Sequence, residues 1–138
     1  MGKLKLGHIA ISISSIEKSS AFYEKNFGFK LKEHIKGDSQ DPDIAILENN
    51  TLRLELFEFK EPKALPEYRK NLLSELQTLG VKHFALETED IEPDYQRLKN
   101  QGVCLGTDIN KLPNGLRYFF IKDPDGIFIE LIERKEKK

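Results

Sequence analysis

The chain has few of the residues that mark several specialised protein classes. Its 138 residues include one cysteine and no tryptophan. The single cysteine, Cys104, excludes an intrachain disulfide, and this fits a reducing cytoplasm. Because Cys104 lies in an apolar stretch, we expect a small buried side chain and not a nucleophile. No apolar run is long enough to cross a bilayer, and the N-terminus lacks a signal-peptide core, so we expect a cytoplasmic protein with no membrane partner.

An excess of charge of one sign is also missing. There are 22 Lys and Arg residues and 23 Asp and Glu residues, giving a net charge of −1, and the two signs are interspersed. Without a basic stripe we expect no nucleic-acid partner. The acidic residues at 38–43 indicate a surface turn rather than a calcium site. With 38% hydrophobic and 33% charged residues, the chain has the composition of one soluble globular domain.

A histidine–glutamate pair occurs twice at one separation. His8 precedes Glu55 by 47 positions (55 − 8), and His83 precedes Glu130 by the same 47 (130 − 83). The second pair therefore follows the first at an offset of 75 (83 − 8). Such a repeat indicates a duplicated module, which is the first feature to seek in a sequence.

The pattern of expected elements repeats with the pair. Each half reads strand, helix, strand, strand, strand, which predicts an α+β fold of two tandem βαβββ modules with curved mixed sheets. We expect a single domain over 1–138, with module 1 at about 4–59, a connector at about 60–80, module 2 at about 81–134 and a charged tail at 135–138. The expected strands cover residues 4–14, 29–36, 44–47, 52–59, 81–88, 103–107, 116–122 and 127–133.

The expected helices have clear end signals. Ser14 and Glu17 form a capping box at the start of the first helix, and Gly28 ends it. Asp90 is a good N-cap for the second helix, and Gly102 closes it.

The connector has a weaker pattern. Leu72, Leu76 and Leu79 fall at helical spacing after a Pro-containing helix start at 65–67. This predicts either a short helix or lid, or a plain linker packed on the sheet.

Strand alternation places both pairs on the face of each sheet that the helices do not cover. Two imidazoles and two carboxylates suit one divalent metal held between the modules, in a cleft walled by Phe57 and Phe128. A duplicated structural ion pair is the alternative interpretation. The predicted metal ligands are His8, Glu55, His83 and Glu130.

The chain resembles the vicinal oxygen chelate superfamily, which includes glyoxalase I, bleomycin resistance proteins and extradiol dioxygenases. The Asp-Pro-Asp-Gly turn at 123–126, followed by the strand that carries Glu130, is quite specific to it. The other matching segments are 7–11, 20–23, 27–29, 54–56, 82–86 and 129–131.

The resemblance implies a function. The full His, Glu, His, Glu set looks like that of glyoxalase I, whereas epimerases of the superfamily typically have Gln at position 55. The expected activity is therefore that of a metal-dependent, lactoylglutathione lyase-like isomerase acting on a small oxygen-chelating substrate through an enediolate. Glu130 would move the proton, with Glu55 on the opposite face. The metal would be Zn, Ni, Co, Mn or Fe, with Zn or Ni favoured, and the protein a homodimer.

Two alternatives follow from the same resemblance. One is a small-molecule binding or resistance protein without catalysis, and the other is an oxygen-using, extradiol dioxygenase-like metalloenzyme. One residue departs from the glutathione-dependent pattern, because Ser12 stands where these enzymes tend to carry Arg. Arg53 shares a face with Glu55 and is the candidate substitute in substrate binding, although a solvated or ion-paired strand arginine is the simpler interpretation.

Overall fold

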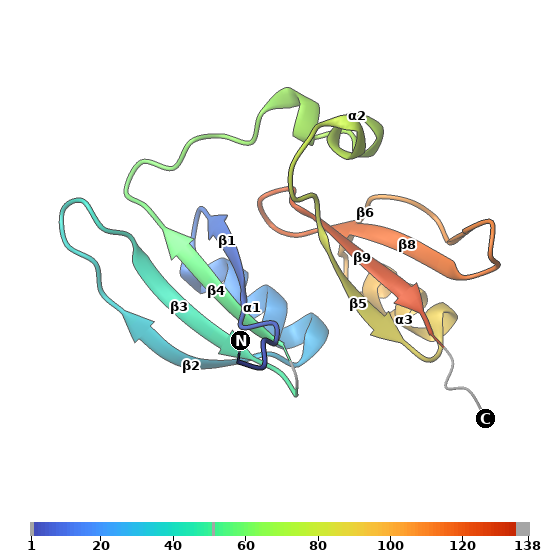
Figure 1. Ribbon diagram of the computed structural model, residues 1–138, viewed down its shortest axis with the longest axis horizontal. Helices are drawn as coiled ribbons and strands as arrows, with labels where there is room; N and C mark the ends of the chain where they lie inside the picture. Colours follow the sequence, from blue (N-terminus) through green and yellow to red (C-terminus); the bar gives the residue numbers. More distant parts are fainter. Residues whose placement is uncertain (1, 51, 135–138) are drawn as a thin grey trace. The chain divides into compact units, whose positions relative to one another are not determined.

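Each half of the chain folds into one mixed sheet with a helix against one face (Figure 1). The computed structural model describes residues 2–50 and 52–134, so the predicted tail at 135–138 lies outside the described residues. The chain divides into two compact units, Met1–Ala64 (unit 1) and Leu65–Lys138 (unit 2). Their boundary falls inside the predicted connector.

Unit 1 has the predicted βαβββ order. The sheet order is β1-β4-β3-β2, in which β1 runs parallel to β4 and the other neighbours are antiparallel. Its elements are β1 (Ile9–Ile13), α1 (Ile16–Phe27), β2 (Lys30–Ile35), β3 (Asp43–Glu48) and β4 (Arg53–Glu58).

Unit 2 repeats this order, with β5 parallel to β9 and β9 antiparallel to β8. The α+β prediction of two mixed sheets is therefore confirmed. One additional short strand, Asn110–Lys111, pairs with β8. It lies between the predicted strands at 103–107 and 116–122, where no strand was expected. The elements are η1 (Glu67–Arg69), α2 (Leu72–Gln77), β5 (Phe84–Thr88), α3 (Ile91–Asn100), β6 (Cys104–Leu105), β7 (Asn110–Lys111), β8 (Arg117–Lys122) and β9 (Phe128–Glu133).

Alternation along the strands fills the core of each unit. In unit 1, α1 packs on β2, β3 and β4, and in unit 2, α3 packs on β8 and β9. Alternate residues of β1, β3 and β4 are buried against α1, and the opposite face of the sheet carries Glu55. The main core residues are Ile11, Ile13, Tyr23, Leu47, Leu54 and Leu56 in unit 1, and Ile91, Leu98, Phe119, Ile121, Ile129 and Leu131 in unit 2.

The start of α1 differs from the prediction by one residue. The N-cap is Ser15, not Ser14, and its Oγ accepts a hydrogen bond from the backbone N of Lys18 at 3.2 Å. Glu58 on β4 contributes a further contact, because its Oε1 accepts a hydrogen bond from the backbone N of Ile16 at 3.2 Å. A strand residue thus satisfies one of the free N–H groups in the first turn of α1.

The ends of the helices follow the predicted glycines more closely. Gly28 has φ 70° and its N–H donates to the carbonyl of Glu24. Gly102 has φ 78°, one residue beyond the C-cap. Both positions need the left-handed conformation, which glycine adopts without strain. Asp90 is the N-cap of α3, but its side chain makes no capping bond.

Two further expectations are corrected. Cys104 is exposed, because β6 is a two-residue strand at the sheet edge and leaves its side chain in solvent. The connector contains the helices η1 and α2, but the spaced leucines do not form a buried stripe. Leu76 and Leu79 are exposed, and the buried residue of α2 is Glu75.

No helix among residues 2–50 and 52–134 combines the length and hydropathy that crossing a membrane requires.

Candidate metal centre

The first histidine–glutamate pair lies near the N-terminal end of β1, in the sheet of unit 1. His8 stands directly before β1, and Glu55 is the third residue of β4. The Nε2 atom of His8 lies 3.3 Å from an Oε atom of Glu55. Glu55 is in register with Ala10, whose small side chain leaves space between the two.

The second pair repeats this arrangement in unit 2. His83 stands directly before β5, and Glu130 is in register with Ala85. The Nε2 atom of His83 lies 2.8 Å from an Oε atom of Glu130. The spacing of 47 residues thus arises from one local geometry formed twice: a parallel strand pair with histidine before the first strand and glutamate on the second.

The two pairs differ in their surroundings. The side chain of His8 is 46% exposed and that of Glu55 22%, whereas those of His83 and Glu130 are 18% and 15% exposed. The ring of Phe120 packs edge-on against His83, with centroids 4.8 Å apart. The pair in unit 2 is therefore better shielded from water.

Aromatic side chains surround Glu130 on the uncovered face of unit 2. Phe120 is in register with Glu130, and the rings of Phe120 and Phe128 meet edge to face at 6.1 Å. Tyr118 contacts Phe120 in the same way at 5.9 Å. The sequence analysis identified Phe128 as part of this wall but missed Phe120. Alternation along β8, which pairs with the strand that carries Glu130, could have placed Phe120 on the same face as Glu130.

The other predicted residues lie on the uncovered face of unit 1. Phe57 is in register with Ser12, so both share the face of Glu55. Arg53 donates from Nε and Nη2 to one carboxylate oxygen of Glu48, at 3.0 and 2.7 Å. This contact matches the simpler interpretation of Arg53 as an ion-paired strand residue.

The structure brings the four predicted ligands together as two pairs. Within residues 2–50 and 52–134, no three or more His, Cys, Asp or Glu side chains are close enough to hold a metal ion. Each pair nevertheless fits half of a ligand shell. Two ligands held about 2.0–2.1 Å from one metal lie about 2.8–3.0 Å apart in an octahedral shell and about 3.3–3.4 Å apart in a tetrahedral one. The observed separations of 2.8 and 3.3 Å match these edges.

The chemistry of the donor set also fits a divalent metal. Two carboxylates balance a charge of +2, and neutral imidazole with carboxylate suits zinc, nickel and related ions. Nδ1 of His83 is buried and has no hydrogen-bond partner among the described residues, so Glu130 alone orients this ring through a hydrogen bond. A metal ion can take the place of the hydrogen bond between His83 and Glu130 and of the ion pair between His8 and Glu55.

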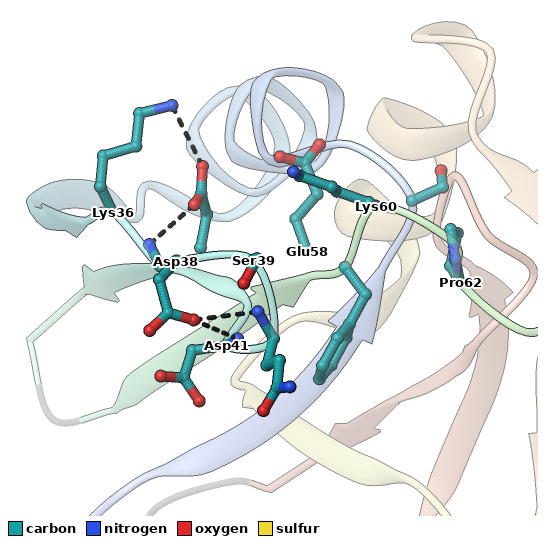
Figure 2. A pocket seen from close by; sticks show the side chains of 12 residues that line it. Lys36, Asp38, Ser39, Asp41, Glu58, Lys60 and Pro62 are labelled. Carbon is teal, nitrogen blue, oxygen red and sulfur yellow. Dashed lines mark hydrogen bonds and ion pairs between the residues drawn. The ribbon is translucent and has the colours of Figure 1, made fainter.

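A separate hollow of about 450 Å³ lies at the end of β4 and contains none of the predicted ligands (Figure 2). It is lined mainly by the loop at 36–43. Backbone N–H groups of Gln40 and Asp41 lower the pKa of the Asp38 carboxyl. The backbone N–H of Gly37, followed by Lys36, lowers that of Asp43. These bonds account for the acid cluster as part of a turn, as predicted.

Comparison with known proteins identifies the family. Residues 5–131 match the family model of the Glyoxalase/Bleomycin resistance protein/Dioxygenase superfamily, and the chain belongs to this family. YwbC of Bacillus subtilis (strain 168), an uncharacterized protein, is 33% identical over 133 residues, covering 94% of this chain and 98% of its own.

Curated relatives with named activities and solved structures of the same fold are also similar to this chain. Lactoylglutathione lyase of Neisseria meningitidis serogroup B is 27% identical over 138 residues, which cover 96% of this chain and 92% of the relative. The crystal structure of a glyoxalase family protein from Enterococcus faecalis has a TM-score of 0.80 and 26% identity, covering 94% and 97% of the two chains. Members of this superfamily are often enzymes and commonly use a divalent metal.

Proposed function

We propose that this protein is a metal-dependent lyase or isomerase of the glyoxalase I type. The observation that carries the proposal is the recurrence of one His–Glu contact, at 3.3 and 2.8 Å, in both units. A solitary strand histidine is commonly structural, but two half-shells of the same kind would supply four protein ligands to one metal. The similarity to a lactoylglutathione lyase supports the reaction class.

In this proposal both pairs hold one divalent metal, with zinc or nickel favoured. The ligands are His8, Glu55, His83 and Glu130. The bound metal would supply Lewis-acid charge that polarises two oxygens of a small substrate and acidifies the neighbouring C–H bond.

Glu130 is the residue that takes and returns the proton. Its carboxylate is 15% exposed and lies beside Phe120 and Phe128, which exclude water from the reacting atoms. Glu55 is more exposed and stands on the other sheet, where it would act on the opposite face of the substrate. Phe57 and Phe128 provide apolar contact surface for substrate.

Glutathione itself is not assumed as the thiol. Ser12 lies on the face of Glu55 and carries no charge, and Arg53 is occupied by Glu48. The proposed substrate is therefore the hemithioacetal of a small thiol, whose identity the assay must determine.

The proposal is tested by metal analysis of the purified protein, followed by isomerisation of hemithioacetals made from several thiols. Replacing Glu130 with Gln keeps a metal-binding oxygen but removes the base, so turnover should fall by at least about 100-fold with metal content largely retained. Glu17→Gln, at an exposed position on α1, which packs on the opposite face of the sheet, is the matched control. Protein that binds no divalent metal favours the non-catalytic binder, and oxygen consumption with catechols favours the dioxygenase-like alternative.

We also propose that the protein is a homodimer, as superfamily members often are. Light scattering measures its mass. Mixing His8→Ala and His83→Ala chains then shows which chain supplies each pair. If the ligands of a site come from two chains, one intact site forms per mixed dimer, and about a quarter of wild-type activity returns. If they come from one chain, none returns.

A further inference from the structure

A lysine lies on the uncovered face of unit 2 beside the proposed metal ligands. Lys122 ends β8, and its Nζ atom lies 5.3 Å from the centroid of the Phe128 ring. The same Nζ donates a hydrogen bond of 3.3 Å to the backbone carbonyl of Lys70. The side chain is partly buried, so its ammonium group is held near the aromatic wall.

The charge of Lys122 is not balanced by a carboxylate. No Asp or Glu oxygen among the described residues lies within 4.0 Å of its Nζ atom. Other partly buried cations of unit 2 are paired: Arg117 with Glu133 and Glu92, and Lys82 with Glu75. The hydrogen bond to Lys70 is solvent-exposed, so the ammonium group is accessible to a ligand, and a ring face and one carbonyl leave its positive charge unbalanced. Lys122 can therefore accept an anionic partner.

Strand register places this ammonium within reach of the proposed reaction. Lys122 is in register with Phe128, and Phe120 with Glu130, so these four side chains share one face. Lys122 and Glu130 are diagonal neighbours, and such positions are about 7–8 Å apart in an antiparallel pair. A small substrate spans this distance.

We propose that Lys122 binds a carboxylate on the substrate and so determines its specificity. The inference rests on the proposed function, in which the oxygens of the same substrate are held at the metal beside Glu130. The substrate class is then a small metal-chelating compound with a carboxylate arm, oriented by the ammonium group and lying against the ring of Phe128. Lys122 is a binding residue in this scheme, and it takes no part in proton transfer.

The test uses matched metal-chelating probes and requires no turnover. Monohydroxamic acids of succinic and glutaric acid chelate metals through two oxygens and carry a terminal carboxylate. Their carboxamide counterparts have the same shape without the charge. Calorimetric titration of the metal-loaded full chain should give at least about tenfold tighter binding of the carboxylate probe, as expected for a charge-assisted hydrogen bond. Added salt should reduce this preference.

The variants separate binding from a structural role. Lys122→Met should abolish the preference with little change in affinity for the carboxamide, and Lys122→Arg should keep most of it. Lys111→Met, an exposed lysine on β7, is the control and should retain the full preference. If Lys122→Met fails to fold, Lys122→Gln replaces it. The preference of the wild-type protein for the carboxylate probe, and the salt dependence of that preference, still test the proposal.

The possible failures are distinguishable. Metal-loaded protein that binds both probes equally overturns this inference and leaves the proposed function intact. The same holds if Lys122→Met weakens both probes to the same extent, because that shows a structural role. Protein that takes up no divalent metal overturns the proposed function, and this inference with it.

Discussion

Replacing Gly106 with Ala should destabilise unit 2 and disturb the aromatic wall around Glu130. A Cβ atom at position 106 would lie 3.1 Å from Cβ of Phe120, 3.2 Å from its carbonyl O and 3.2 Å from Cε1 of Phe128. The backbone at Gly106 cannot easily move away from Phe120, because the N–H of Gly106 donates a hydrogen bond of 2.7 Å to the carbonyl of Phe120. Carbon atoms pack best at about 3.5–4.0 Å, so the neighbours must move by a few tenths of an ångström.

The expected cost of this overpacking is about 1–3 kcal/mol in the free energy of unfolding. Gly106 does not have positive φ, so alanine introduces no backbone strain there. Alanine also stabilises by about 0.4–1 kcal/mol through the unfolded chain, which partly masks the loss. Gly7→Ala has the same effect on the unfolded chain but meets no atom within 4 Å, so it is the matched control.

Urea unfolding followed by far-UV circular dichroism measures both variants against the wild type. We expect Gly106→Ala to be less stable than Gly7→Ala by about 1–3 kcal/mol. Displacement of Phe128 should also weaken binding of the hydroxamic acid probes. Equal unfolding free energies for the two variants would refute the reasoning, because the close approach to Phe120 would then have no energetic consequence.

Three further predictions concern metal, pH and a buried charge. His8→Ala and His83→Ala should each lower metal affinity by at least about tenfold, measured by competition with a chelating dye, because each removes one ligand. Asp43→Asn should destabilise at pH 7 but have little effect well below pH ~4, because the folded-state pKa of Asp43 is depressed and its contribution is lost as pH falls through that value. Glu75→Gln should lower the unfolding free energy by about 1–3 kcal/mol, because this buried carboxylate contacts two cations of unit 2.

Each of these has a control within the chain. His34→Ala removes a third histidine, paired at 3.6 Å with Asp43 outside both metal pairs, and should retain metal. Asp41→Asn changes an exposed neighbour of Asp43, and its effect should be small at both pH values. Glu89→Gln alters an exposed glutamate and should leave stability unchanged. Loss of metal in His34→Ala, or equal pH profiles for the two aspartate variants, would contradict the corresponding argument.

Local sequence signals predicted much of the fold because they act over a few residues. Strand alternation, Gly28 and Gly102 at the helix ends, and the turn at 123–126 depend on steric limits of the chain itself. In that turn the N–H of Gly126, which has φ 84°, donates to the carbonyl of Asp123 at 3.0 Å. The duplicated module followed from the repeated order of these signals.

The failed expectations depended on contacts that no local pattern reveals. The N-cap of α1 is Ser15 rather than Ser14, and Glu58, 42 residues from Ile16, accepts the free N–H of Ile16. Cys104 is exposed because its strand lies at a sheet edge, which the apolar composition of the segment does not reveal. The buried side of α2 carries Glu75 rather than leucine, because Arg69 and Lys82 provide its partners.

The sequence by itself determined the module order and the identity of the two His–Glu pairs, because residue spacing and strand parity are properties of the chain. Only the tertiary structure decided what surrounds each pair. The parallel pairing of β5 with β9, and the placing of β8 beside β9, bring Phe120, Phe128 and Lys122 around Glu130. The β5–β9 contact joins segments that are distant in the sequence, so packing of the whole unit sets it. The β8–β9 contacts form within one hairpin, where the register of the pairing decides which side chains become neighbours of Glu130.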